Sequence, residues 1–218
     1  MDEEELRARA GRAIRDLGHA FVGHEAPDDL LAELAKTLDG LSLRLTGQPP
    51  RARDLDAHTE RWGEELPQGL IPRAYGDRPV SGPASPWGLD LDVHRHGDEI
   101  DARLTLHAAH EGAPGRSHGG VVAALFDDVF GFVLGVIGQP AFTGSLSIRY
   151  VTATPLHRPL SCRARATGRE GRKIHVAGEL VDVEADEVTA RATALFIAVD
   201  PRIHFASSAE RPAPPDED

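Results

Sequence analysis

The chain has little cysteine, few aromatic residues and a shortage of positive charge. A single cysteine, Cys162, excludes an internal disulfide and favours a reducing compartment, so we expect a cytoplasmic protein. Lys and Arg total 24 against 35 acidic residues, giving a formal net charge of -11, which argues against general affinity for nucleic acid or an anionic membrane. The acidic start, Met1-Asp-Glu-Glu-Glu5, and the absence of a recognisable spanning run predict neither a signal peptide nor a membrane segment.

Hydrophobic residues make up 40% of the 218 residues, enough for one full core and an appended element. Apolar residues at helical spacing predict a helical extension over residues 1–45, packed on the main domain or on a partner subunit. Recurrent proline and glycine over residues 46–85 predict an arm or linker. Residues 86–205 are expected to form the main domain and residues 206–218 a disordered tail.

The main domain carries strand patterns on both sides of one apolar helix. Alternating residues predict a hairpin with strands at 89–94 and 99–107. After a helix that ends near Gly138, four more strands are predicted, at 143–152, 160–167, 173–183 and 188–199. This order predicts an α+β fold in which a curved antiparallel sheet wraps around a long central helix.

The predicted central helix is apolar almost all the way round, yet it carries Asp127 and Asp128. A buried carboxylate costs free energy unless it is paired, protonated or used in chemistry. At 100° per residue, Asp127 lies on a stripe of small residues and Asp128 lies at its edge, which favours a functional Asp127 and a half-exposed Asp128. The stripe predicts close approach of a ligand or another chain's helix, and its small residues are Gly120, Ala124, Gly131 and Gly135. The opposite, bulky arc is expected to fill the sheet and consists of Val122, Leu125, Phe126, Val129, Phe130, Val133, Val136 and Ile137.

The start of this helix, Gly119-Gly120, predicts unpaired backbone N–H groups where the helix dipole favours negative charge. An oxyanion site would use these donors, and a phosphate site is the alternative. His94 and His96 would share one face of a strand, but no third ligand has suitable spacing, so no metal site is predicted. Cys162 lacks a catalytic partner in its strand pattern and is expected in the core.

Several motifs stand at spacings that together resemble the hotdog-fold acyl-CoA thioesterases, in the PaaI-like branch of the 4-hydroxybenzoyl-CoA thioesterase superfamily. They are His118-Gly-Gly120, Asp127, Gly131, the strand from Thr143 to Leu156, and Gly171-Arg-Lys173 followed by Gly178-Glu-Leu180. The resemblance covers about residues 86–200 and leaves out the N-terminal helices and the arm. It implies a hotdog fold whose subunits pair edge to edge, in a homodimer or homotetramer with active sites at the dimer interface.

The resemblance also implies residue roles. The Gly120 N–H would polarise the thioester carbonyl, and Asp127 from the partner subunit would act as general base for water or, as the weaker alternative, as nucleophile. Thr143 would help to hold the water or the carboxylate, and His118 would orient the loop or form a hydrogen bond near the carbonyl. The residues expected to bind substrate, including cations for the CoA phosphates, are Gly119, Arg116, Ser145, Arg172 and Lys173.

The sequence therefore predicts an acyl-CoA thioesterase that hydrolyses an acyl thioester to free acid and CoA, without a metal or other cofactor. Two alternatives stay open: a non-hydrolytic acyl-CoA-binding hotdog protein with a regulatory or interaction role, and a dehydratase of 3-hydroxyacyl thioesters that uses His118 as base. Phe130, Phe132 and Phe142 suggest an apolar acyl pocket but do not identify the acyl group.

Overall fold

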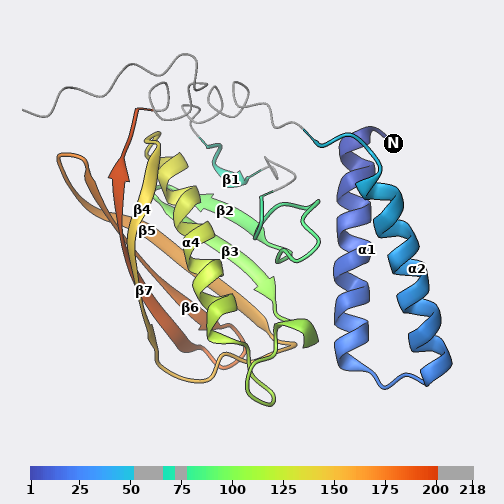
Figure 1. Cartoon of the computed structure of the whole chain (residues 1–218). Coiled ribbons are helices and arrows are strands. Elements are labelled where there is room, and N and C mark those ends of the chain that lie inside the picture. Colours follow the sequence, from blue (N-terminus) through green and yellow to red (C-terminus); the bar gives the residue numbers. More distant parts are fainter. Residues whose placement is uncertain (52–65, 72–77, 201–218) are drawn as a thin grey trace, which may run out of the picture.

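The computed structural model describes residues 1–51, 66–71 and 78–200, so the predicted tail and parts of the predicted arm lie outside it. A curved antiparallel sheet wraps around the helix α4 (Gly119–Val136), and the helices α1 (Glu3–Gly23) and α2 (Asp28–Thr46) lie together to one side (Figure 1). The α+β architecture predicted from the order of the elements is confirmed, as is the hotdog fold that the family resemblance implies.

The sheet has seven strands in the described residues, in the order β1-β2-β3-β5-β6-β7-β4, with antiparallel pairing throughout. All six predicted strands form, although the first begins later than predicted. The short β1 was missed because two residues show no alternation. The strands are β1 (Gly69–Leu70), β2 (Asp92–His96), β3 (Glu99–Thr105), β4 (Ala141–Tyr150), β5 (Pro159–Glu170), β6 (Lys173–Asp182) and β7 (Glu187–Ala198).

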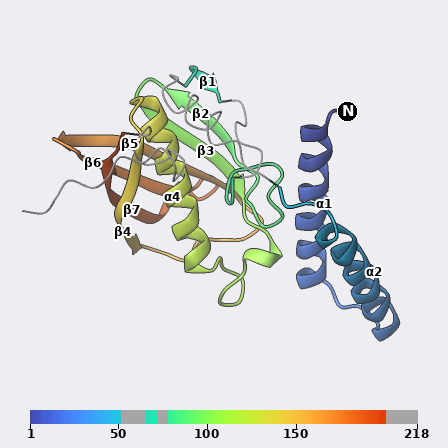
Figure 2. The same cartoon turned by 45° about the horizontal axis from the view of Figure 1, so that its top comes forward.

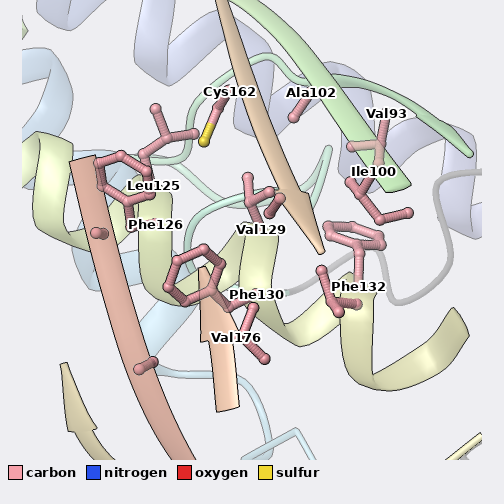
Figure 3. Close-up of a cluster of buried hydrophobic side chains, with 14 of the residues drawn as sticks. Val93, Ile100, Ala102, Leu125, Phe126, Val129, Phe130, Phe132, Cys162 and Val176 are labelled. Carbon is pink, nitrogen blue, oxygen red and sulfur yellow. The ribbon is translucent and has the colours of Figure 1, made fainter. Parts of the chain in front are cut away.

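The bulky face of α4 fills the concave side of the sheet (Figure 3). Phe130 lies at the centre, with its ring centroid 5.7 Å from that of Phe126 and 6.5 Å from that of Phe196 on β7. Gly178 on β6 makes room for it, because a Cβ there would lie 2.8 Å from the Phe130 ring. The predicted bulky arc is buried except for Ile137, which is the C-cap and is 39% exposed.

The helix α4 is long and apolar enough, by length and composition alone, to cross a membrane. This corrects the expectation that the sequence holds no such run. Because 56% of the segment is buried within the protein, enclosure by the sheet accounts for its apolar character.

The helix α1 is fixed to the domain by Arg15, which is buried although it is charged. Its guanidinium donates hydrogen bonds to the carbonyl oxygens of Pro83, at 3.0 Å, and Ser85, and forms an ion pair with Asp90 at 3.0 Å. At Gly11 the backbones meet closely, since a Cβ there would lie 2.5 Å from a backbone oxygen. Figures 1 and 2 show α1 between α2 and the domain, and α2 has no buried residue.

A histidine cluster forms the other part of this contact. His19 of α1 lies with its ring centroid 5.1 Å from that of His107 and 4.7 Å from that of His110, at the short helix η1 (Ala108–His110). Burial, followed by the charges of His19 and His107, lowers the pKa of His110 to about 4. Burial and His107 also lower the pKa of His19. The contact therefore favours the neutral forms of His19 and His110.

The Arg15 contact predicts a specific loss of stability. Arg15→Met keeps an apolar stem but leaves two backbone carbonyls without their donor, so we expect the free energy of unfolding to fall by about 2–3 kcal/mol and α1 to exchange its amide hydrogens faster. Denaturant titration and hydrogen exchange measure both effects. Arg12→Met is the matched control, because exposed Arg12 lies 3.7 Å from Asp90 and should change stability by less than about 0.5 kcal/mol. Equal effects of the two substitutions would contradict this role of Arg15.

The histidine cluster predicts a pH dependence. The pKa of His110 falls from 6.5 to about 4 on folding, so the folded state binds fewer protons than the unfolded chain in this range. The stability from this group is complete above pH 6.5 and is lost as the pH falls toward about 4. Allowing for screening by water, we expect a loss on the order of 1–2 kcal/mol, measured as a fall in Tm. His110→Gln should flatten this dependence and the exposed control His24→Gln should keep it; an equally steep dependence in both would refute the assignment.

Candidate active site

The first turn of α4 is capped by His118, whose Nδ1 accepts a hydrogen bond from the Gly120 N–H at 3.0 Å. The Val121 N–H donates to the His118 carbonyl oxygen, also at 3.0 Å. The prediction that the Gly120 N–H is unpaired is therefore wrong in this structure. Because Nδ1 is an acceptor here, a neutral His118 carries its proton on Nε2, and the ring presents an N–H donor of its own.

Tyr150, at the end of β4, fixes the same turn from the other side. Its hydroxyl donates a hydrogen bond to the Gly119 carbonyl oxygen at 2.8 Å. A Cβ on Gly119 would lie 3.1 Å from that hydroxyl, so glycine permits this close approach. The sequence predicts Gly119 as a substrate-binding residue and indicates no role for Tyr150. The only signal for Tyr150 in the sequence was its place in the strand motif.

Asp127 and Thr143, two residues of the predicted site, lie together within one chain. The Thr143 hydroxyl donates to Asp127 Oδ1 at 2.9 Å, and both residues are exposed. Thr143 lies where the pairing of β4 with β7 shifts register, between Thr143 and Ser145. Among the described residues β4 is an edge strand of the sheet, and the exposed Asp127 carboxylate lies beside it. Ser145 is exposed on the same strand.

Asp128 has a structural partner instead. Its side chain is only 9% exposed and pairs with Arg78 at 2.8 Å, which corrects the prediction of a half-exposed charge. The arm accounts for part of the small-residue stripe as well. A Cβ on Gly131 would lie 3.1 Å from the Arg78 guanidinium, and one on Gly135 would lie 2.8 Å from Leu66. The chain's own arm thus covers this half of the stripe, where the sequence predicts a ligand or another chain's helix.

The other half of the stripe borders a pocket of about 350 Å³. Gly120 and Ala124 line it from α4, together with His118. Its remaining wall is largely apolar and comes from α1, from residues 80–89, from η1 and from Val121 of α4. The phenylalanines expected to line a pocket do not line this one: Phe130 is in the core, Phe132 lies under the Arg78 guanidinium, and Phe142 is exposed on β4.

Gly120 and Asp127 are seven residues apart on one helix, which separates them by about 10 Å along its axis. A thioester carbonyl and one attacking water do not span that length with normal hydrogen-bond geometry. Within one chain, the group expected to bind the thioester carbonyl, at Gly120, and the expected base, Asp127, therefore lie in two separate places.

The cations predicted to bind the CoA phosphates also lie in two separate places. Arg116 is exposed on the loop that precedes α4. Arg172 donates from Nε to the Ala198 carbonyl oxygen at 3.1 Å, and Lys173 begins β6 beside it. Their turn lies near the C-terminal end of α4, at the opposite end from Gly120 (Figure 1).

Two other candidates take no part in this site. Cys162 is fully buried, and burial raises the pKa of its thiol, so it is a core residue (Figure 3). The rings of His94 and His96 stack with centroids 6.1 Å apart on β2. Among residues 1–51, 66–71 and 78–200, no group of three His, Cys, Asp or Glu side chains is arranged to hold a metal ion.

Comparison with known proteins finds relatives of the segment that carries this geometry. Residues 115–192 match the model of the thioesterase superfamily. The chain is 32% identical over 91 residues to the acyl-coenzyme A thioesterase THEM4 of Mus musculus, covering 42% of this chain and 39% of that protein. It is 30% identical over 91 residues to THEM4 of Bos taurus, covering 42% and 37%. The match thus spans less than two fifths of the length of either relative.

A crystal structure of a thioesterase superfamily protein superposes with a TM-score of 0.73 and 28% sequence identity, covering 88% of this chain and 94% of that one. The segment that matches the superfamily model includes α4, with His118, Gly120 and Asp127, and the strand β4 with Thr143. Residues 115–192 of this hotdog protein therefore belong to the thioesterase superfamily.

Proposed function

We propose that the protein is an acyl-CoA thioesterase, which hydrolyses an acyl thioester to a free acid and CoA. The observation that carries this proposal is the exposed Asp127 carboxylate, held by Thr143 on a helix whose first turn borders an apolar pocket. Superfamily membership and the curated relatives support the reaction class. No metal or further cofactor is needed, and the single cysteine favours a cytoplasmic setting.

In the proposed reaction, the Asp127 carboxylate removes a proton from water as the water oxygen attacks the thioester carbonyl carbon. The carbonyl π electrons move to oxygen and form an oxyanion. When the carbonyl re-forms, the C–S bond breaks, and CoA leaves as a thiolate that is then protonated. Thr143 donates to one carboxylate oxygen and leaves the other to accept from water. A thiolate is a good leaving group, which lessens the need for a general acid.

The oxyanion requires a hydrogen-bond donor near the first turn of α4. His118 supplies Nε2–H while its Nδ1 stays bound to the Gly120 N–H. If the ring turns away, the Gly120 N–H becomes the donor, at the end of α4 where the helix dipole favours negative charge. Both arrangements place the carbonyl at the mouth of the apolar pocket, since His118 and Gly120 both line it.

A complete site is proposed to need two subunits, because Gly120 and Asp127 of one chain are too far apart to act on one carbonyl. The exposed edge strand β4 carries Thr143 and lies beside Asp127, so pairing of this edge with a second copy would bring Asp127 toward the partner's pocket. A homodimer, or a homotetramer built from it, is the proposed assembly. Arg116 of one subunit and Arg172 with Lys173 of the other are the proposed contacts of the CoA phosphates.

The proposed base is tested by Asp127→Asn, which can still accept the hydrogen bond from Thr143. We expect kcat to fall by about 10²–10⁴, because a general base contributes that much, while Tm stays unchanged. Hydrolysis of a panel of acyl-CoAs, followed with a thiol reagent, measures the effect. Asp128→Asn is the control: it loses the ion pair with Arg78 and should lower Tm while changing kcat by less than about threefold. Full activity of Asp127→Asn would contradict the mechanism. CoA binding without turnover by the parent protein would favour the acyl-CoA-binding alternative.

The shared site is tested by complementation. Asp127→Asn lacks the base, and Gly120→Val obstructs the carbonyl position. A heterodimer isolated by two different affinity tags contains one intact site, so we expect about half of the parent activity from two inactive chains. A heterodimer of two Asp127→Asn chains is the control and should stay inactive. A mixed heterodimer as inactive as this control would show that each site belongs to one chain.

A further inference from the structure

The outer wall of the pocket is α1, which lies outside the segment that matches the superfamily model. Ile14 and Gly18 face the pocket from α1, and Trp87 and Leu89 close it from the segment before β2. His118 and Gly120 of α4 stand on the same pocket. A carbonyl bound at the start of α4 would therefore lead its acyl group away from α4 and toward α1.

We propose that α1 forms a wall of the acyl-binding pocket and that Gly18 limits the size of the acyl group accepted there. This inference rests on the proposed thioesterase function. The substrate class is an uncharged, apolar acyl group larger than a benzene ring, either a medium-length chain or an arylalkanoyl group. The pocket volume of about 350 Å³ supports this size, since a cavity of about 150 Å³ can hold benzene.

The electrostatic character of the pocket supports an apolar occupant. Arg15 is the charged residue that lines it, and its guanidinium already binds two backbone carbonyls and Asp90. His19 and His110 also line it, and their lowered pKa values keep both imidazoles neutral near pH 7. A carboxylate or another charged group on the acyl chain would meet no available counter-charge in this lining.

The wall is fixed in place, as a specificity determinant requires. Arg15 and the close contact at Gly11 attach α1 to residues 83–85, which directly precede the pocket-lining residues 86–89. His19, one residue after Gly18, accepts a hydrogen bond from the Ala109 N–H at 3.2 Å. Gly18 is thus held between two contacts with the domain, so a side chain added there cannot move away easily.

Gly18 leaves open space at this wall. A Cβ added to it would meet no atom within 4 Å, although the residue lines the pocket. Glycine inside a helix costs about 1 kcal/mol relative to alanine, so a larger residue is compatible with helix formation. Gly40 on α2 offers a matched control, since a Cβ there also meets nothing within 4 Å and the residue is exposed away from this pocket.

The experiment compares the parent protein with Gly18→Leu and Gly40→Leu. The measured quantity is the ratio of kcat/KM for octanoyl-CoA to that for acetyl-CoA. We expect Gly18→Leu to lower this ratio at least about tenfold, because the leucine side chain occupies the space of the longer acyl group, and Gly40→Leu to change it by less than about twofold. Ile14→Ala, which widens the same wall, should raise the ratio for acyl groups larger than octanoyl. Unchanged ratios in Gly18→Leu and Ile14→Ala would overturn the proposal.

Binding without turnover separates this proposal from the proposed function. Trp87 lines the pocket, and Trp62→Phe would leave it as the single tryptophan of the chain. Its fluorescence, titrated with a non-hydrolysable octanoyl-CoA thioether, should give a Kd that rises at least about tenfold in Gly18→Leu. If the parent binds the thioether in this way but hydrolyses no acyl-CoA, the role of α1 as a pocket wall is supported and the proposed function is refuted. If it hydrolyses acyl-CoAs with the same profile in both leucine variants, the function stands and the wall is refuted.

Discussion

Burial of the bulky face of α4 in the curved sheet is the interaction on which the rest of this structure depends. The side chains concerned, among them Phe126, Phe130 and Val129, are fully buried, and each contributes about 1.5–3 kcal/mol on transfer from water. This packing fixes the rotation of the helix about its axis. Asp127 is thereby directed toward β4 and Asp128 toward the arm, so two adjacent carboxylates enter different environments. One remains accessible beside Thr143, while the other pairs with Arg78.

Segments outside the main domain complete surfaces that the domain leaves open. The arm brings Arg78 and Leu66 onto the glycines of α4, and α1 closes the pocket at its first turn. Both contacts depend on glycines. Gly131 and Gly135 leave room for the arm on α4, and Gly11 leaves room for the loop that holds α1. The helical extension is therefore a structural component of the pocket, and changes in α1 would alter which acyl group fits without touching the proposed chemistry.

Much of the fold could be predicted because its signals are local and repetitive. Alternating residues placed the six longer strands, and the apolar character of α4 predicted its enclosure. Asp127 and Thr143 were identified as candidates by the spacing of motifs that resemble those of a family, which left open whether Thr143 holds the carboxylate or the water. The partners of Asp128 and of Gly119 could not be predicted in this way. Arg78 is 50 residues from Asp128 and Tyr150 is 31 from Gly119, and neither contact has a periodic signal.

The sequence by itself determined the order of the elements, the bulky and small faces of α4, and the position of its two carboxylates, because helix and strand periodicity follow directly from residue order. Only the tertiary structure decided which groups are already used: His118 caps the Gly120 N–H, Arg78 pairs with Asp128, and α1 walls the pocket. These contacts join segments that are distant along the chain or depend on side-chain rotation. Their formation depends on how the packed elements meet in space, and the spacing of residues along the chain does not predict that arrangement.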